Sequence, residues 1–292
     1  MTKMDASRKF GTIESEGFTL NYIIEGRGKP ILVIGSSLYD HRVFSPELRK
    51  SHRWFFVDHR GFGIAPAGTF ENSAFDLAVL LSDIERARVV FGLSEFVIVG
   101  HSGHAFMAIE YAKKYPQYVK GVVLTGCGPS NSDERRKASW EYFEATASPE
   151  RKKFFESGMK PLADKIQSEP EKRFVHYCLC AGAQGWYDPS FDATYLWDGL
   201  TTNMQMFDHV WGVIFRDIDI TSGLDRFNTP TLLMLGRYDY LTGPPELWNN
   251  AKPLFHNIRE KIFEQSAHCP QYEESTMFNE TLLKWLRDID YW

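Results

Sequence analysis

The feature that most constrains the fold is the alternation of short apolar runs with longer segments of helical period. Apolar residues recur at helical spacing in residues 74–91 and 105–115. The runs that we expect to be strands are residues 19–24, 30–34, 54–57, 96–99, 122–124, 230–235 and 261–264. This alternation predicts an α/β protein with a mostly parallel central sheet flanked by helices, in which residues 19–24 form an early antiparallel strand.

The alternation stops after Gly126. From there to Asp225 the chain is rich in charged and aromatic side chains, reads as helices and contains no convincing buried strand. We therefore expect a core formed by residues 1–128 and 229–292, with a helical insertion, residues 129–228, after the sixth strand. The aromatic side chains of the insertion either pack its own core or line a pocket beneath it.

The composition narrows the possible partners. The 292 residues carry a formal net charge of -5, with 43% hydrophobic and 24% charged residues. A negative chain lacks the basic face that nucleic acid or an anionic membrane attracts, so we expect neither as a partner. We find no signal peptide and no apolar run of roughly 20 residues, which predicts a cytoplasmic protein with a small-molecule substrate. The oligomeric state stays open.

The cysteines and glycines indicate no cofactor. Cys127, Cys178, Cys180 and Cys269 are too few for a disulfide framework, and no companion pair or histidine stands at zinc-ligand spacing. We expect buried free thiols and no metal. The glycine pairs of the chain do not open a G-x-G-x-x-G turn, so we expect no dinucleotide either.

A sharp strand-to-helix turn is the strongest functional signal. In residues 97–106, VIVGHSGHAF, an apolar strand runs through Gly100, Ser102 and Gly103 into a helical pattern. Such a turn presents an exposed serine and tolerates little side-chain volume beside it, which accounts for the glycines. We interpret Ser102 as a candidate nucleophile.

Two further polar residues follow later strands. Asp239 comes after the strand that ends at Leu235, and His268 after the strand that ends near Phe263. Carboxyl ends of parallel strands meet at one edge of the sheet, so the three side chains are expected to converge there. An imidazole can take and return the proton of a serine hydroxyl, and a carboxylate fixes its tautomer. The order Ser, Asp, His is one known order of a catalytic triad.

Two amides are candidate oxyanion donors. The turn leaves the N–H of Gly103 at a helix start, and the loop after the strand ending at Ile34 offers Ser36. His104 stands where a second glycine is usual. It is either a satisfied interior histidine or an accessory residue that hydrogen-bonds the loop of Ser36 and Ser37.

These residues resemble the α/β-hydrolase family over nearly the whole chain. Residues 58–63, DHRGFG, are similar to the family's D-x-R-G-x-G loop, residues 236–239, GRYD, to its G-x-x-D turn, and residues 267–270, AHCP, to its terminal histidine segment. The last two are most similar to the proline iminopeptidase branch. The insertion stands where members carry a helical cap over the active site.

The resemblance implies an α/β-hydrolase fold, with Ser102 as nucleophile, Asp239 as acid, His268 as base and the Ser36 and Gly103 amides as oxyanion donors. The serine turn differs from the G-G-S-W-G of those peptidases, and Ile34-Gly35 replaces the usual His-Gly. The resemblance therefore implies the type of reaction but leaves the substrate open. Our candidate pocket residues are Ser37, Phe207, Trp211, Leu241 and Cys269.

Three functions fit the sequence. The leading hypothesis is a cofactor-free serine hydrolase that forms an acyl-enzyme from a small carboxylic ester or lactone. The alternative is an aminopeptidase that releases N-terminal proline, for which cap acids such as Asp188, Asp192 and Asp208 would bind the substrate ammonium. The third is a receptor on the same fold that hydrolyses little or nothing.

Overall fold

A computed structural model describes residues 8–68, 70–216 and 218–292. Its centre is an eight-stranded sheet in the order β1-β2-β4-β3-β5-β6-β7-β8. β1 and β2 are antiparallel and all other pairs except β2–β4 are parallel. The strands are β1 (Lys9–Ser15), β2 (Phe18–Gly26), β3 (Pro30–Gly35), β4 (Arg53–Asp58), β5 (Phe96–His101), β6 (Val119–Thr125), β7 (Thr231–Gly236) and β8 (Ile258–Phe263).

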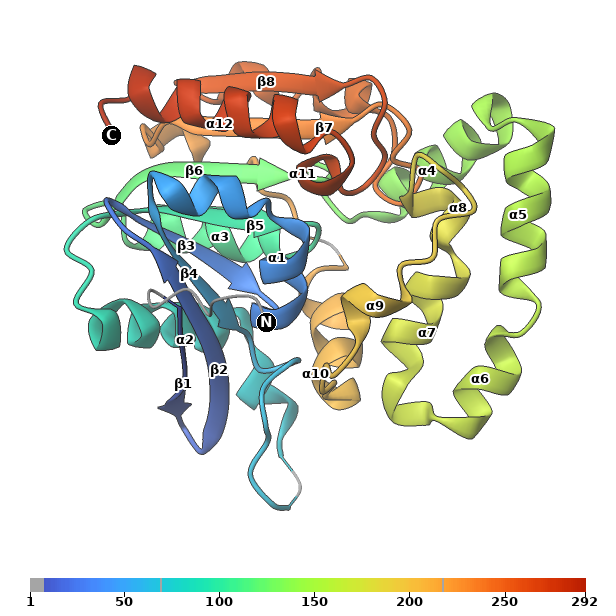
Figure 1. The fold of residues 1–292 in the computed structure, drawn as a ribbon, viewed down its shortest axis with the longest axis horizontal. Coiled ribbons are helices and arrows are strands. Elements are labelled where there is room, and N and C mark those ends of the chain that lie inside the picture. The colour runs from blue at the N-terminus through green and yellow to red at the C-terminus, as the bar shows by residue number, and fades with distance from the viewer. Residues whose placement is uncertain (1–7, 69, 217) are drawn as a thin grey trace, which may run out of the picture.

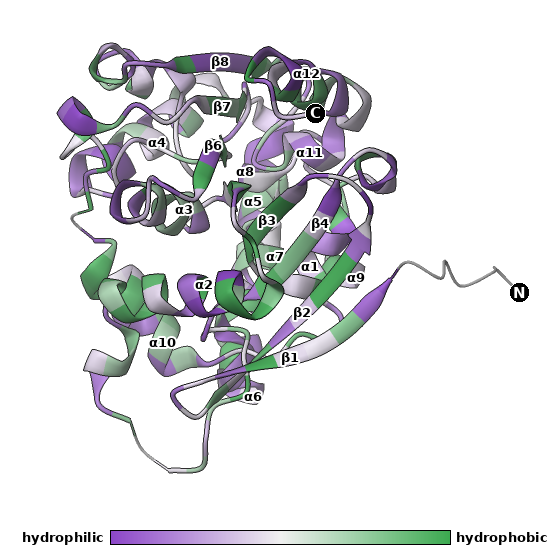
Figure 2. Ribbon diagram, turned by 90° about the vertical axis from the view of Figure 1, so that its left-hand side faces the viewer, coloured by the Kyte–Doolittle hydropathy of each residue, from purple (hydrophilic) through white to green (hydrophobic). Residues whose placement is uncertain are grey.

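The central strands are buried on both faces. In β3, Leu32 and Ile34 belong to one hydrophobic cluster, whereas Ile31 and Val33 belong to another. Side chains alternate between the two faces of a strand, so an uninterrupted apolar run is what a sheet covered on both sides requires. In Figure 2 the middle strands are accordingly coloured as hydrophobic.

Helices cover the two faces. α2 (Leu77–Phe91) and α3 (His104–Lys114) contribute to the first cluster, while α1 (Ser37–Val43) and α12 (Ser275–Asp288) contribute to the second. The short α11 (Pro270–Glu273) precedes α12. Two layers of helices around one sheet are the architecture that the alternation of elements predicted.

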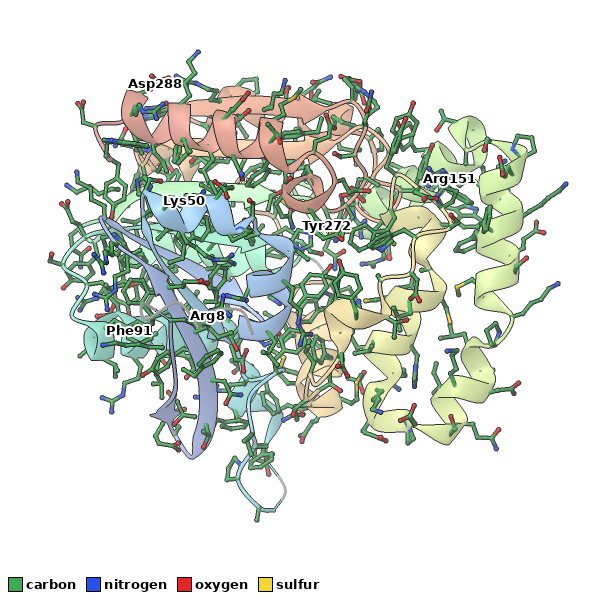
Figure 3. All side chains as sticks on the ribbon, in the orientation of Figure 1. Arg8, Lys50, Phe91, Arg151, Tyr272 and Asp288 are labelled. Atoms are coloured by element: carbon green, nitrogen blue, oxygen red, sulfur yellow. The ribbon has the colours of Figure 1, made fainter. Side chains whose placement is uncertain are left out.

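The insertion between β6 and β7 is helical. Figure 1 shows its helices beside the end of the sheet toward which the arrowheads of β6, β7 and β8 point. The helices are α4 (Asp133–Thr146), α5 (Pro149–Met159), α6 (Leu162–Ser168), α7 (Arg173–Cys180), α8 (Gly182–Gly185), α9 (Thr194–Trp197) and α10 (Met204–His209). Arg151 of α5 donates to the backbone carbonyls of Ala183 and Trp186 at 2.7 Å each, which ties α5 to the turn of α8 (Figure 3).

The expected strands all appear, and the structure adds one. Between residues 129 and 228, the described residues form no strand, as predicted. β1 was missing from the prediction because it is an edge strand whose first residues are exposed, so its sequence lacks a clear apolar run. The helix expected from residue 74 begins at Leu77, after a 3-10 turn at Asn72–Phe75. No helix in the described ranges combines the length and apolar character needed to cross a bilayer.

Candidate active site

Ser102 occupies a strained turn between β5 and α3. Its φ of 58° lies in the left-handed region, which a non-glycine residue adopts only where the surroundings demand it. Its amide donates to the carbonyl of Thr125 at the end of β6, 2.9 Å away. A Cβ on Gly100 would lie 2.4 Å from the carbonyl oxygen of His104, so only glycine fits there. The predicted strand-to-helix turn is therefore present, and neighbouring backbone holds it in place.

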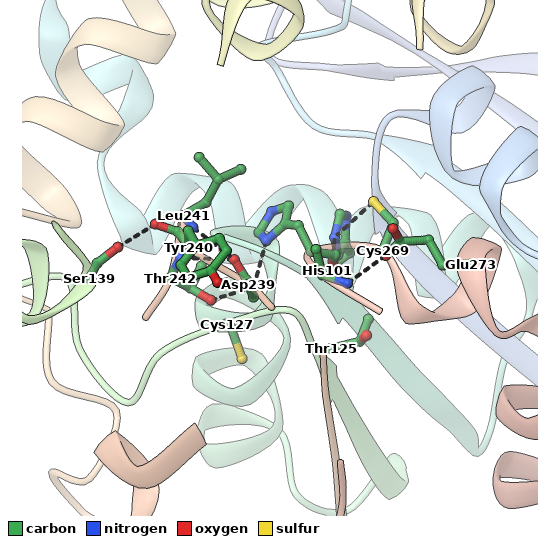
Figure 4. Close-up of polar contacts among 12 residues, drawn as sticks. His101, Thr125, Cys127, Ser139, Asp239, Tyr240, Leu241, Thr242, Cys269 and Glu273 are labelled. Atoms are coloured by element: carbon green, nitrogen blue, oxygen red, sulfur yellow. Dashed lines mark hydrogen bonds and ion pairs between the residues drawn. The ribbon is translucent and has the colours of Figure 1, made fainter. Parts of the chain in front are cut away.

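Asp239 and His268 form a hydrogen-bonded pair. Nδ1 of His268 lies 2.8 Å from Oδ2 of Asp239. The amides of Leu241 and Thr242 donate to Oδ1 at 3.0 Å each, and the Thr242 hydroxyl donates to Oδ2 at 2.5 Å (Figure 4). Burial alone would raise the pKa of Asp239, but His268 and these donors hold it below its ordinary value. The carboxylate is thus ionised beside the imidazole.

His101 holds the backbone of His268. Its Nε2 donates to the carbonyl oxygen of His268 at 2.8 Å, and the thiol of Cys269 lies 3.8 Å from the same nitrogen (Figure 4). Burial, with the nearby His268 as a second cause, lowers the pKa of His101 to about 3, so the ring is neutral. Sequence reasoning missed this residue. Its position in the G-x-S segment was the available signal.

Ser102 and His268 line one cavity of about 400 Å³. Three of the five candidate pocket residues, Trp211, Leu241 and Cys269, also line it. Two candidates do not. Phe207 turns its ring against Phe174 behind the wall, with ring centroids 4.2 Å apart.

Ser37 is the second candidate outside the wall. It is buried, and its amide donates to Oδ1 of Asp58 at 2.5 Å. The cavity wall includes residues that sequence reasoning missed, which lie on α1, α4 and α7; they are Tyr39, Asp40, Arg135, Phe174, Tyr177 and Cys178. The positions of those on α4 and α7 depend on how the insertion packs onto the sheet, and no local motif marks any of the six.

The oxyanion loop differs from expectation at Ser36. The Ser36 amide is not free, because it donates to Oδ2 of Asp40 at 2.9 Å. Burial raises the pKa of Asp40 to about 8, so the carboxyl group is mostly neutral at pH 7. The Gly103 amide, by contrast, has no acceptor in the part of the chain that the structure describes. A Cβ on Gly103 would lie 2.8 Å from the Trp211 ring, so this glycine lets the indole approach the turn.

His104 does not hydrogen-bond the loop of Ser36 and Ser37. Both of its ring nitrogens are buried, and neither has a hydrogen-bond partner among the described residues. The ring packs against His59, with centroids 4.7 Å apart, and burial lowers the pKa of His104 to about 4. The loop contact that we considered is therefore wrong, and the residue is an interior histidine packed among the rings of His59, Phe62 and Trp211.

The cap acids lie away from the cavity. Asp188 accepts from Ser190, Asp192 accepts from the amide of Thr194, and Asp208 pairs with Arg173. None of the three acids is among the cavity-lining residues. Within residues 8–68, 70–216 and 218–292, no group of three or more His, Cys, Asp or Glu side chains is placed to hold a metal ion.

The parallel sheet, the strained serine turn and the Asp–His pair at the strand ends define an α/β-hydrolase. The chain belongs to the alpha/beta hydrolase fold family, which matches residues 23–275. It is thus a hydrolase of this superfamily.

Particular relatives agree with this assignment. The chain is 45% identical to the AB hydrolase superfamily protein YclE of Bacillus subtilis, over 94% of this chain and 98% of that protein. It is 27% identical to the proline iminopeptidase PfmaB of Pestalotiopsis fici, over 91% and 95%. The structure of an esterase from Exiguobacterium antarcticum has a TM-score of 0.67 at 18% identity, over 96% of this chain and all of that one, which shows the shared fold.

Proposed function

We propose that the protein is a serine hydrolase that cleaves a small carboxylic ester or lactone through an acyl-enzyme, with Ser102, His268 and Asp239 as its triad. The observation that carries this proposal is the 2.8 Å contact between His268 Nδ1 and Asp239 Oδ2 at the wall of the cavity that Ser102 also lines. The contact assigns the proton of the ring to Nδ1 and leaves Nε2 as a base for the serine hydroxyl.

The reaction has two halves. In the first, His268 Nε2 takes the hydroxyl proton as Ser102 Oγ attacks the ester carbonyl carbon, and the ring then gives that proton to the departing alkoxide. In the second, Nε2 takes a proton from water, the hydroxide attacks the acyl carbon, and the proton returns to Ser102 as the acid leaves. Asp239 stabilises the imidazolium that forms in each half.

The oxyanion is stabilised by two amides. The Gly103 N–H is unengaged and follows the nucleophile directly, so it is the first donor. Ser36 N–H is the second. It donates to Asp40 in the resting enzyme, but a neutral carboxyl is a weaker acceptor than an oxyanion, so the bond transfers when negative charge develops.

Residues 129–228 form the cap of this enzyme and set its specificity. Their helices contribute Phe174, Trp197 and Trp211 to the cavity wall. An apolar wall of this kind suits an uncharged acyl or alcohol portion of a substrate.

The aminopeptidase alternative has support from the relatives named proline iminopeptidases. It needs carboxylates that face the substrate ammonium. The three cap acids do not line the cavity, whereas Arg135 and Arg136 do, and arginine would repel an ammonium group. The ester or lactone reading therefore has the better support.

The test compares wild type with Ser102→Ala on 4-nitrophenyl esters of short and medium acyl chains and on a prolyl arylamide. We expect ester turnover by wild type, little on the amide, and neither in the variant. Faster turnover of the prolyl amide would favour the aminopeptidase. Labelling with a fluorophosphonate tests the receptor alternative. A failure of Ser102 to react would contradict both enzyme hypotheses and favour the receptor.

A further inference from the structure

The end of the cavity beneath α4 is positively charged. Arg135 and Arg136 line it beside Ser130 and Asn131. Asp40 is the one carboxyl group among the lining residues that the structure describes, and burial raises its pKa to about 8. The wall therefore carries net positive charge at neutral pH, apart from the histidine of the proposed triad.

Arg135 is held by neutral acceptors. Its Nη1 donates to the carbonyl of Leu241 at 2.8 Å and its Nη2 to Oδ1 of Asn131 at 2.5 Å. Its Nε is buried without a partner, and the guanidinium forms no ion pair with any carboxylate of the described residues. Burial lowers the pKa of Arg135, yet a guanidinium stays protonated in proteins. Such a charge is costly unless an anion compensates it.

Two buried arginines lie elsewhere in the fold. Arg60 binds both carboxylate oxygens of Asp83, and Arg151, like Arg135, donates to neutral acceptors, in its case three backbone carbonyls. Neither lines the cavity. Arg136 does, but it forms an ion pair with Asp133. Arg135 is thus the lining guanidinium that forms no ion pair with a carboxylate of the described residues, although the charge of Asp239 favours its protonated form.

The position of Arg135 relates it to the proposed triad. Its Nη1 bond to Leu241 fixes it to the loop that carries Asp239, two residues away in sequence. Trp211, whose ring lies beside the turn of Ser102, also lines the cavity. A ligand in this cavity therefore meets both aromatic rings and a guanidinium.

We propose that Arg135 binds an anionic group of the substrate, so that the enzyme prefers esters or lactones that carry a carboxylate. This inference rests on the serine hydrolase function proposed above. Each Nη atom uses one N–H for Leu241 or Asn131 and keeps another, which can donate a charge-assisted hydrogen bond to a carboxylate.

The first test needs no variant. 4-Nitrophenyl hexanoate and the 4-nitrophenyl monoester of adipic acid have acyl chains of the same length, and the second ends in a carboxylate. We expect the kcat/KM of wild type to be about tenfold or more higher for the carboxylate ester, because charge-assisted hydrogen bonds to the carboxylate stabilise the bound substrate by that amount. A wild-type preference for the neutral ester would overturn the proposal.

The second test removes the guanidinium. Arg135→Met should lose most of the preference, because KM should rise more for the adipate ester than for the hexanoate ester. Lys137→Met is the matched control, since Lys137 is an exposed cation on the same helix and does not line the cavity. Equal losses on both esters would assign Arg135 a structural role and contradict the proposal.

A binding measurement separates this proposal from the catalytic one. In Ser102→Ala, adipate should raise the melting temperature more than hexanoate does, and Arg135→Met in that background should abolish the difference. If adipate binds in this way but wild type cleaves neither ester, the anion site stands and the proposed hydrolysis fails. If the esters are cleaved with no carboxylate preference, and adipate does not bind, the anion site fails and the hydrolase stands.

Discussion

Oδ2 of Asp239 lies 2.8 Å from Nδ1 of His268, and the same oxygen accepts the hydroxyl of Thr242 at 2.5 Å. The carboxylate is thus held in place from two sides, and its charge is directed at the imidazole. This geometry explains why the ring keeps one tautomer.

Asp239→Asn should preserve the shape of this contact and remove its charge. An amide can donate to Nδ1, which favours the wrong tautomer of His268, so we expect kcat on a 4-nitrophenyl ester to fall by about 10⁴. The measurement is a steady-state comparison with wild type, and the control is unchanged denaturant unfolding. Asp198→Asn, an exposed cap position, should leave kcat unchanged. A loss of less than tenfold in Asp239→Asn would argue against the triad.

Ionisation of Asp40 should lower kcat/KM at alkaline pH, which gives the pH profile a falling limb. Its pKa of about 8 means that it is neutral at pH 7 and becomes an anion above pH 8, where it holds the Ser36 amide more tightly and repels an oxyanion. We expect kcat/KM to fall about tenfold for each pH unit above that pKa. Asp40→Asn cannot ionise and should lack this limb in a profile from pH 6 to 10. The same limb in the variant would assign it to another group.

The buried pair of Arg60 and Asp83 should be essential for stability. The Arg60 Nε and Nη2 atoms donate to the two Asp83 oxygens at 2.7 and 2.9 Å, and both side chains are buried. Asp83→Ala removes the buried carboxylate and leaves Arg60 an ion pair with the exposed Glu16, so we expect the free energy of unfolding in urea to fall by about 3–5 kcal/mol. Glu95→Ala removes an exposed pair with Lys120 and should cost about 1 kcal/mol or less. Similar losses in both variants would contradict the special role of the buried pair.

The buried histidines should make the protein sensitive to acid. Burial lowers the pKa of His104 to about 4, whereas an unfolded histidine titrates near 6.5. Below pH 6.5 the unfolded chain therefore binds protons that the native state excludes, so stability is complete above that pH and is lost toward pH 4. At pH 5 the loss is about 2 kcal/mol for one such histidine.

His104→Phe isolates this contribution. The ring nitrogens have no partners, so the variant should be about as stable as wild type at pH 7.5. The drop in unfolding free energy between pH 7.5 and pH 5 should be smaller than in wild type by about 2 kcal/mol. His256→Phe, at an exposed position, should leave the drop unchanged. An unchanged drop in His104→Phe would mean that His104 is protonated in the native state.

The sequence by itself determined the fold class, the succession of the main strands along the chain and the positions of Ser102, Asp239 and His268 after strand ends. These features follow from local rules: an apolar run buried on both faces predicts a central strand, and a glycine-flanked serine between a strand and a helix predicts the sharp turn. The edge strand β1 was not predicted, because the apolar pattern of a half-exposed strand is weaker than that of a buried one.

Only the tertiary structure decided which side chains face the cavity and which donors are free. Asp40 engages the Ser36 amide, Phe207 turns behind Phe174, and Arg135 bonds to Leu241, which is 106 residues away in the chain. The Arg135–Leu241 contact depends on how the helical insertion packs against the strand ends, and the Phe207–Phe174 contact on how the helices of the insertion pack on one another. Packing joins segments distant in sequence, and no periodicity or motif within either segment specifies the partner.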